Sequence, residues 1–275
     1  MTGNLPVSVL MPCYNASKYI GTAIESVLGQ SFRDLELVIA EDRSTDNTWE
    51  IVQSYAAKDP RIRIAQNREN LRIAKNRNRL LELARGKYIA WQDADDISEP
   101  LRIEHQIAFL DAHPEVGIVG GWLRFFTDAD PEGFVRKYAP DDARLRAKIY
   151  RYSPVAQPGA MIPKKVLDEM GEYKSEFDAT EDLDMSFRIG AKYRFANLQE
   201  VVIRYRENIS SATFTRLPEM ERKTFAIRKL NCANPAYRLT FGDRLYNLLQ
   251  WISMFIIPPR WKISLFHFIR NLGNR

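Results

Sequence analysis

Three aspartates close a hydrophobic segment at residues 88–96, which reads Tyr-Ile-Ala-Trp-Gln-Asp-Ala-Asp-Asp. Asp93, Asp95 and Asp96 follow an apolar run typical of a buried strand, so their charges crowd onto the end of that strand. Carboxylates this close repel one another unless a cation or a shared proton relieves them. Mg²⁺ and Mn²⁺ prefer oxygen ligands and are often held by one or two carboxylates together with phosphates. The spacing therefore fits a metal site for a nucleotide diphosphate, and an acidic helix cap before Pro100 is the alternative.

The elements that must position these carboxylates alternate between strands and helices. Alternation of this kind predicts an α/β fold with a parallel sheet and helices on both faces. Ligands of such sheets bind beyond the carboxyl ends of the strands. Tyr14, the acidic loop at residues 41–46 and the aspartates at 93–96 all follow predicted strands, which predicts one site at this edge. The predicted strands are 7–11, 35–40, 61–65 and 87–92, and the predicted helices are 18–28, 48–57 and 73–84.

Two common phosphate-binding loops are missing after the first strand. The chain has neither the dinucleotide fingerprint G-x-G-x-x-G nor the P-loop G-x-x-x-x-G-K-[ST] at that place, so no glycine cradle holds the nucleotide. A nucleotidyltransferase, which also uses paired aspartates, would need a loop rich in lysine and glycine there. Residues 12–15 are Pro-Cys-Tyr-Asn, which argues against that alternative.

The composition is that of an ordinary globular protein, with 275 residues, 45% hydrophobic and 27% charged. Cys13 and Cys232 are too few for a disulfide framework, which favours a reducing cytoplasm. The first residues lack the basic and apolar regions of a signal peptide, and no segment reaches the roughly 20 apolar residues of a membrane span. We therefore expect a cytoplasmic protein, with a peripheral place on the inner face of the cell membrane left open.

The net charge of +5 lies entirely in residues 236–275. This distribution excludes a broadly basic nucleic-acid binder, so we expect no nucleic-acid partner. Apolar residues of 245–256 recur at helical spacing, and the segment that carries Trp251 and Trp261 has flanking Arg and Lys residues, as in helices that lie in a membrane interface. A helical cap on the catalytic domain or a homodimer contact is the alternative. The charge favours an anionic membrane surface contacted through residues 241–275.

An ordered series of motifs resembles family 2 glycosyltransferases over residues 5–210. The resemblance implies a GT-A type nucleotide-binding sheet flanked by helices, a nucleotide-sugar donor, a divalent metal (Mn²⁺ or Mg²⁺) and inversion at the anomeric carbon. It predicts a catalytic domain at 1–215, with a nucleotide-sugar half at 1–100 and an acceptor half at 101–215. A helical, aromatic and basic extension follows at 216–275. The motifs that carry the resemblance lie at residues 7–15, 26–32, 41–46, 70–78, 84–96 and 181–188.

The resemblance assigns the nucleotide to residues of the first half. Pro12 and Tyr14 would line the nucleoside pocket, and Asp42 would accept a hydrogen bond from the base. A carboxylate suits the ring N–H of a pyrimidine base, and UDP is the expected nucleotide. Arg77 would face the base or the diphosphate. A core aromatic for Tyr14 and a solvated helix face for Arg77 are the structural alternatives.

The metal and the general base also follow from the resemblance. Asp93 would contact the ribose or a metal-bound water, and Asp95 would ligate a metal that neutralises the leaving diphosphate. Asp182 would take the proton from the acceptor hydroxyl, so that one base gives a single displacement and inversion. Asp184 is the second candidate, and Glu181 would orient the base or the acceptor. Carboxylates in the first turn of a helix are also favoured by its dipole without any chemistry.

The sequence differs from the resembling family at three points, and one loop is expected to lie on the acceptor side. Arg72 stands where many relatives have glycine. Residues 204–208, Arg-Tyr-Arg-Glu-Asn, resemble a Tyr-Arg-x-His segment of the family, with Asn208 in place of a histidine that could be a metal ligand in relatives. Arg72 and Asn208 could each contact the donor. No Gln-x-x-Arg-Trp segment follows, which favours the transfer of one sugar per encounter over processive synthesis. Residues 150–165, rich in proline and glycine, are expected to form an irregular loop on the acceptor side. The acceptor would be a glycan or a lipid-linked glycan, and a non-catalytic glycan- or lipid-binding relative is the alternative.

Overall fold

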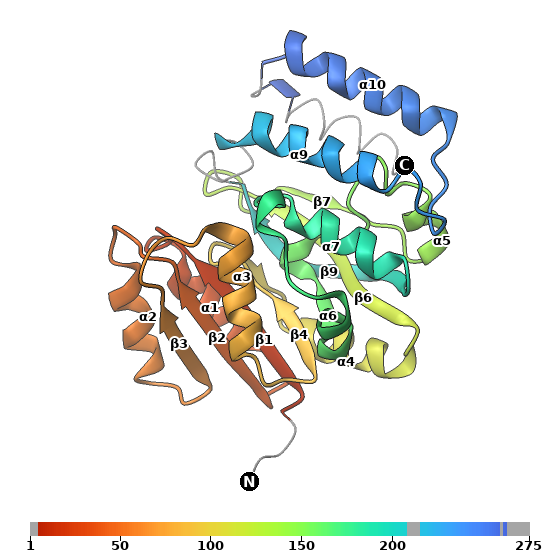
Figure 1. Cartoon of the computed structure of the whole chain (residues 1–275). Coiled ribbons are helices and arrows are strands. Elements are labelled where there is room, and N and C mark those ends of the chain that lie inside the picture. The colour runs from red at the N-terminus through yellow and green to blue at the C-terminus, as the bar shows by residue number, and fades with distance from the viewer. Residues whose placement is uncertain (1–4, 208–214, 259–260, 263–275) are drawn as a thin grey trace.

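The computed structural model describes residues 5–207, 215–258 and 261–262 of the chain (Figure 1). In this part, nine strands form one sheet in the order β3-β2-β1-β4-β8-β6-β9-β5, with β7 paired to β6. The strands are β1 (Val7–Cys13), β2 (Leu35–Glu41), β3 (Ile62–Gln66), β4 (Tyr88–Trp91), β5 (Ile97–Ser98), β6 (Val116–Phe126), β7 (Phe134–Arg136), β8 (Met161–Pro163) and β9 (Arg194–Arg206). The α-helices are α1 (Ile20–Leu28), α2 (Thr48–Ala56), α3 (Arg72–Leu83), α4 (Arg102–Ala112), α5 (Asp142–Arg146), α6 (Lys164–Met170), α7 (Glu181–Gly190), α9 (Leu217–Leu230) and α10 (Phe241–Ile256).

Helices cover both faces of the sheet because its strands bury side chains on both sides. On β1, Leu10 belongs to a core shared with α3, α6 and α7. Its neighbours Val9 and Met11 belong to a second core, shared with α1, α2 and α4. Strands β3, β2, β1 and β4 are parallel. The predicted α/β alternation and the parallel sheet of the first half are confirmed, with shifts of a few residues at element ends.

Beyond β4 the sheet becomes mixed. Strand β8 is antiparallel to β4 and to β6, and β9 runs parallel to β6. The expectation of an irregular loop over 150–165 is therefore wrong in part, because this segment contains the short helix η1 (Gln157–Gly159) and the strand β8 inside the sheet. Three residues are too few for a periodic pattern, so β8 left no signal in the sequence.

The two C-terminal helices lie on the side of the sheet that carries α7. Helix α9 adds Ile227 to the core around α7, and α10 lies beyond α9 (Figure 1). Helix α10 begins with a capping box of Thr240 and Asp243, and Asp243 is its one fully buried residue. Among the residues that the structure describes, no helix is both long and apolar enough to cross a bilayer. The division into domains predicted from the sequence stays a prediction.

Candidate active site

The aspartates of 93–96 lie in the turn between β4 and β5, at the carboxyl edge of the parallel strands. Strand β5 follows them, and α4 begins only at Arg102, so the alternative of a helix cap is wrong. Asp96 has a structural place: its Oδ1 accepts a hydrogen bond from the backbone N–H of Arg206 on β9, at 2.8 Å. Burial raises the pKa of Asp96 well above its usual range. Asp93 and Asp95 remain the candidates for ligand binding.

Arg77 joins three elements at this edge. It is 6% exposed, so a solvated helix face is wrong. Its Nε donates to Glu181 Oε1 at 3.1 Å, its Nη2 lies 3.5 Å from Asp93 Oδ1, and its guanidinium stacks 4.6 Å from the ring centre of Trp91. Burial acts to lower the pKa of Arg77, but the carboxylates of Asp93 and Glu181 outweigh it and the pKa is raised. The α3 cation therefore fixes the end of β4 to the start of α7.

The three acidic residues of α7 have different surroundings. Glu181 is buried against Arg77, and burial raises the pKa of its carboxyl to about 7. Asp182 is partly exposed; its Oδ1 accepts from the N–H of Leu183 at 2.8 Å, and burial raises its pKa. Asp184 pairs with Arg188 at 2.8 Å within the same helix. Of the three, Asp182 has the carboxylate least committed to a protein partner.

A cavity of about 880 Å³ connects these groups to the second half of the chain. Asp93, Arg77, Glu181 and Asp182 form one part of its wall, whereas Asp184 is absent from it. Much of the remaining wall comes from residues 151–158, α9 and α10, and strands β6, β7 and β9 contribute to it as well. The cavity thus brings Asp93, Arg77 and Asp182 to one wall.

Asp93 and Asp95 fit a divalent metal that also binds phosphate oxygens. Burial and the charge of Asp93 raise the pKa of Asp95 to about 6, which is the crowding that a cation would relieve. Within residues 5–207, 215–258 and 261–262, no three His, Cys, Asp or Glu side chains form a metal-binding group. A metal here would therefore depend on the two aspartates and the donor phosphates, an arrangement usual for Mg²⁺. Asn208, the predicted contact on this side, lies outside the described residues.

The residues predicted to contact the nucleoside lie at the ends of β1 and β2. Tyr14 is 50% exposed, so a core aromatic is wrong, and Pro12 precedes it at the end of β1. Asp42 is buried and both of its carboxylate oxygens hold the loop before α3: they accept from the N–H groups of Leu71 and Arg72 at 2.7 and 2.9 Å. Asp42 therefore stabilises the loop before α3. Its contact with the base stays a prediction.

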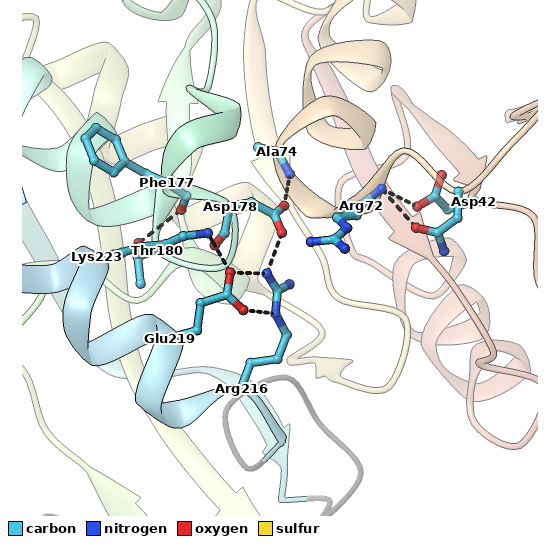
Figure 2. A network of polar contacts seen from close by, with 10 residues as sticks. Asp42, Arg72, Ala74, Phe177, Asp178, Thr180, Arg216, Glu219 and Lys223 are labelled. Atoms are coloured by element: carbon cyan, nitrogen blue, oxygen red, sulfur yellow. Dashed lines mark hydrogen bonds and ion pairs between the residues drawn. The ribbon is translucent and has the colours of Figure 1, made fainter. Parts of the chain in front are cut away.

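Arg72 begins α3 with a φ of 64°, in the left-handed region that favours glycine. This explains why glycine would be the easier residue at this position, and the two bonds to Asp42 hold the strained backbone in place. Its side chain is exposed and projects toward the Asp178 network in Figure 2. A contact between Arg72 and the donor stays a prediction.

Asp178 ties α3, α7 and α9 together (Figure 2). Its Oδ1 accepts from the N–H of Ala74 at 2.9 Å, and its Oδ2 accepts from Arg216 Nη2 at 2.8 Å. Lys223 Nζ donates to the Asp178 carbonyl at 2.9 Å, and both cations also contact Glu219. Because Arg77 and Glu181 lie on the elements joined here, this network supports their contact.

The sequence did not predict that Arg206 and Asp128 lie beside the loop that carries Asp95. Arg206 Nε donates to the Asp95 carbonyl at 3.1 Å, and its guanidinium stacks on Tyr19 at 4.2 Å. Arg206 also forms an ion pair with Asp128, which in turn pairs with Lys18 at 2.8 Å. Arg206 stands in the Tyr-Arg segment that resembles the family, so its position could have been identified, whereas Asp128 carries no motif.

Comparison with known proteins identifies the family. The sequence profile described as "Glycosyl transferase family 2" matches residues 8–171. The chain belongs to this family. It is 34% identical to EpsE of Bacillus subtilis (strain 168), a protein named as a glycosyltransferase, over 212 residues that cover 76% of this chain and 75% of EpsE. The protein is therefore a glycosyltransferase, as predicted, and the nucleotidyltransferase and binding-protein alternatives lose their support.

Solved structures agree on the fold. S. aureus TarS in complex with UDP-GlcNAc matches with a TM-score of 0.68 and 21% identity, over 94% of this chain and 75% of that one. The mannosyltransferase PcManGT from Pyrobaculum calidifontis, in complex with GDP-Man and Mn²⁺, matches with a TM-score of 0.64 and 18% identity, over 93% and 71%. The GT-A type fold with its curled sheet, predicted from the motifs, is confirmed.

Proposed function

We propose that this glycosyltransferase is an inverting, metal-dependent enzyme that moves one sugar per encounter from a UDP-sugar to a glycan or lipid-linked glycan. The observation that carries the proposal is one cavity lined by both Asp93 and Asp182, with Arg77 between them. The donor diphosphate belongs at the Asp93 end, since UDP-GlcNAc and GDP-Man are bound by structures of the same fold. We place the enzyme in the assembly of surface polysaccharides.

Asp182 is the proposed general base. An acceptor hydroxyl that enters the cavity donates its proton to the Asp182 carboxylate while the oxygen attacks the anomeric carbon, on the face opposite the diphosphate. Glu181 acts indirectly, because it holds Arg77 in place. A divalent ion held by Asp93 and Asp95 would neutralise the charge that develops on the departing diphosphate. Pro12, Tyr14 and Asp42 are proposed to surround the nucleoside.

A panel of nucleotides tests the donor assignment. We expect UDP, and one UDP-sugar above others, to raise the melting temperature of the full chain in the presence of Mn²⁺ and not in its absence. Stabilisation by GDP or dTDP compounds would mean that the donor carries a different nucleotide, with the enzyme class unchanged. A chain that responds to no nucleotide would contradict the proposed donor site.

We further propose that the enzyme is peripheral on the inner face of the cell membrane and contacts anionic lipid through α10. This helix docks on the protein by its polar side: Asp243 is buried, and Asn247 donates to the Tyr150 carbonyl at 3.1 Å. Its apolar side chains face away, with Trp251 50% and Phe255 73% exposed. Exposed apolar surface beside basic residues is what an interfacial helix presents to a membrane.

Liposome partitioning tests this placement. Replacing Trp251→Ser and Phe255→Ser together should release the protein from anionic liposomes, while Leu230→Ser, a matched exposed leucine on α9, should leave binding unchanged. Equal partitioning of the double variant and the wild type would contradict membrane contact. A shift to lower molecular mass in the double variant, measured by light scattering, would point to a homodimer through this face instead.

A further inference from the structure

Arg228 of α9 is a buried cation in the wall of the cavity, and its hydrogen-bond acceptors are all neutral. Its Nη1 donates to Asn247 Oδ1 and Gln250 Oε1, both at 2.8 Å, and its Nη2 donates to the Arg151 carbonyl at 2.9 Å. Its Nε is buried and has no acceptor within the described residues. The side chain is 6% exposed. One donor of a buried guanidinium in the cavity wall is thus without a protein acceptor among the described residues.

The carboxylates around Arg228 are committed to other cations. Asp243 pairs with Arg151, and Glu221 pairs with Lys262 at 2.8 Å. In the ranges that the structure covers, Arg228 forms no ion pair with a carboxylate. Burial lowers the pKa of Arg228 to about 10, so the guanidinium is still charged at neutral pH. Burial outweighs the charge of Asp243, which acts on Arg228 without forming an ion pair with it. A buried charge with no carboxylate in direct contact is costly, and an anionic ligand would reduce that cost.

Apolar side chains also line the cavity. They are Leu217 and Met220 of α9, Leu249 of α10, and Ile257. Leu249 is itself 58% exposed in the part of the chain that the structure describes, and it belongs to the exposed apolar face of α10. The cavity wall therefore combines a carboxylate, Asp182, with a buried cation, Arg228, and a group of apolar side chains. That combination suits a ligand that carries a hydroxyl, an anion and a long apolar chain.

We propose that Arg228 binds the phosphate of a lipid-phosphate-linked sugar and so selects this class of acceptor. The inference rests on the proposed function, because it takes Asp182 as the base that receives the acceptor hydroxyl. The sugar lies toward Asp182, the phosphate accepts hydrogen bonds from the Arg228 guanidinium, and the lipid chain leaves between Leu249 and Ile257. Charge-assisted bonds to phosphate are among the stronger hydrogen bonds in proteins, which makes Arg228 a specificity determinant.

Three small probes separate the parts of this proposal. Octyl phosphate carries the anion and the chain, octyl glucoside carries the chain and a sugar but no anion, and inorganic phosphate carries the anion alone. Binding of each to the full chain is measured by calorimetry below the micelle concentration. We expect octyl phosphate to bind the wild type most tightly, and Arg228→Gln to weaken it about tenfold. Arg228→Lys, which keeps the charge, should retain part of the affinity.

Two further measurements keep the test decisive. Leu249→Asn, on an exposed helix face, should weaken octyl phosphate and leave inorganic phosphate unchanged, and it tests the apolar exit even if Arg228→Gln fails to fold. Binding of UDP with Mn²⁺ should be the same in all variants, so its loss would count against the donor site and not against this inference. Equal binding of octyl phosphate and octyl glucoside, or of octyl phosphate to wild type and Arg228→Gln, would overturn the proposal. Equal binding of inorganic phosphate and octyl phosphate would indicate an adventitious ion only.

Discussion

The surroundings of Arg77 at the edge of the sheet and of Arg228 between the C-terminal helices differ in their charged partners. At the sheet edge, one buried cation faces the carboxylates of Asp93 and Glu181, with Asp182 nearby. At the outer helices, one buried cation faces only neutral acceptors. The first region is left with excess negative charge and the second with excess positive charge. Each imbalance is of the sign that the proposed ligand would correct: a metal ion at the edge and a phosphate at the helices.

The largest effect should come from the base at the sheet edge. Asp182→Asn removes the proton acceptor, and we expect transfer to fall by about 10³-fold while UDP binding stays unchanged. Asp184→Asn is the matched control, because Asp184 pairs with Arg188 and is absent from the cavity wall. Steady-state transfer assays and calorimetry would measure both. Turnover retained in Asp182→Asn and lost in Asp184→Asn would reverse the assignment.

Removing the central cation should cost stability. Arg77→Gln leaves Glu181 buried beside Asp182 without its counter-charge, so we expect the free energy of unfolding at neutral pH to fall by about 3–5 kcal/mol. Arg79→Gln, on the exposed face of the same helix, should change it by about 0.5 kcal/mol or less. Urea denaturation measures both variants. A stable Arg77→Gln protein would mean that the edge does not depend on this cation.

The smallest of these effects is a pH dependence from Glu181. Its pKa rises from 4.5 to about 7 on folding, so the folded chain holds a proton that the unfolded chain releases. The stability from this group is therefore full below about pH 4.5 and is lost as the pH rises through 7. Glu181→Gln stays neutral and lacks this loss, so its stability relative to the wild type should improve by about 1–3 kcal/mol from pH 4.5 to 8. Urea titrations at several pH values would show it, and parallel profiles would contradict it.

Much of the first half of the fold could be predicted because its signals are local. The apolar runs of β1, β2 and β4 and the periodicity of α1 and α3 are contained in short windows, and parallel strands bring their carboxyl ends together. The position of Asp93 at the edge follows from these facts alone. The contact of Arg77 with Glu181 joins residues 104 positions apart, and no local pattern reports it.

The C-terminal helices show a second limit of the sequence. The spacing of apolar residues predicts a helix in 245–256, and α10 confirms it, but spacing does not say which face is buried. Here the polar face docks, through Asp243 and Asn247, and the apolar face is exposed. The sequence also could not predict that Arg228 lacks an ion-paired carboxylate. This depends on the ion pairs that Asp243 and Glu221 form with Arg151 and Lys262.

The anomeric configuration of the released sugar tests the central claim most directly. With the α-linked UDP-sugar selected by the nucleotide panel and water as the acceptor, proton NMR follows which anomer forms first. Attack by a single hydroxyl deprotonated at Asp182 predicts the β anomer, which equilibrates only later. Initial release of the α anomer would contradict the single displacement, and with it the role of Asp182 and the arrangement of donor and acceptor in the cavity.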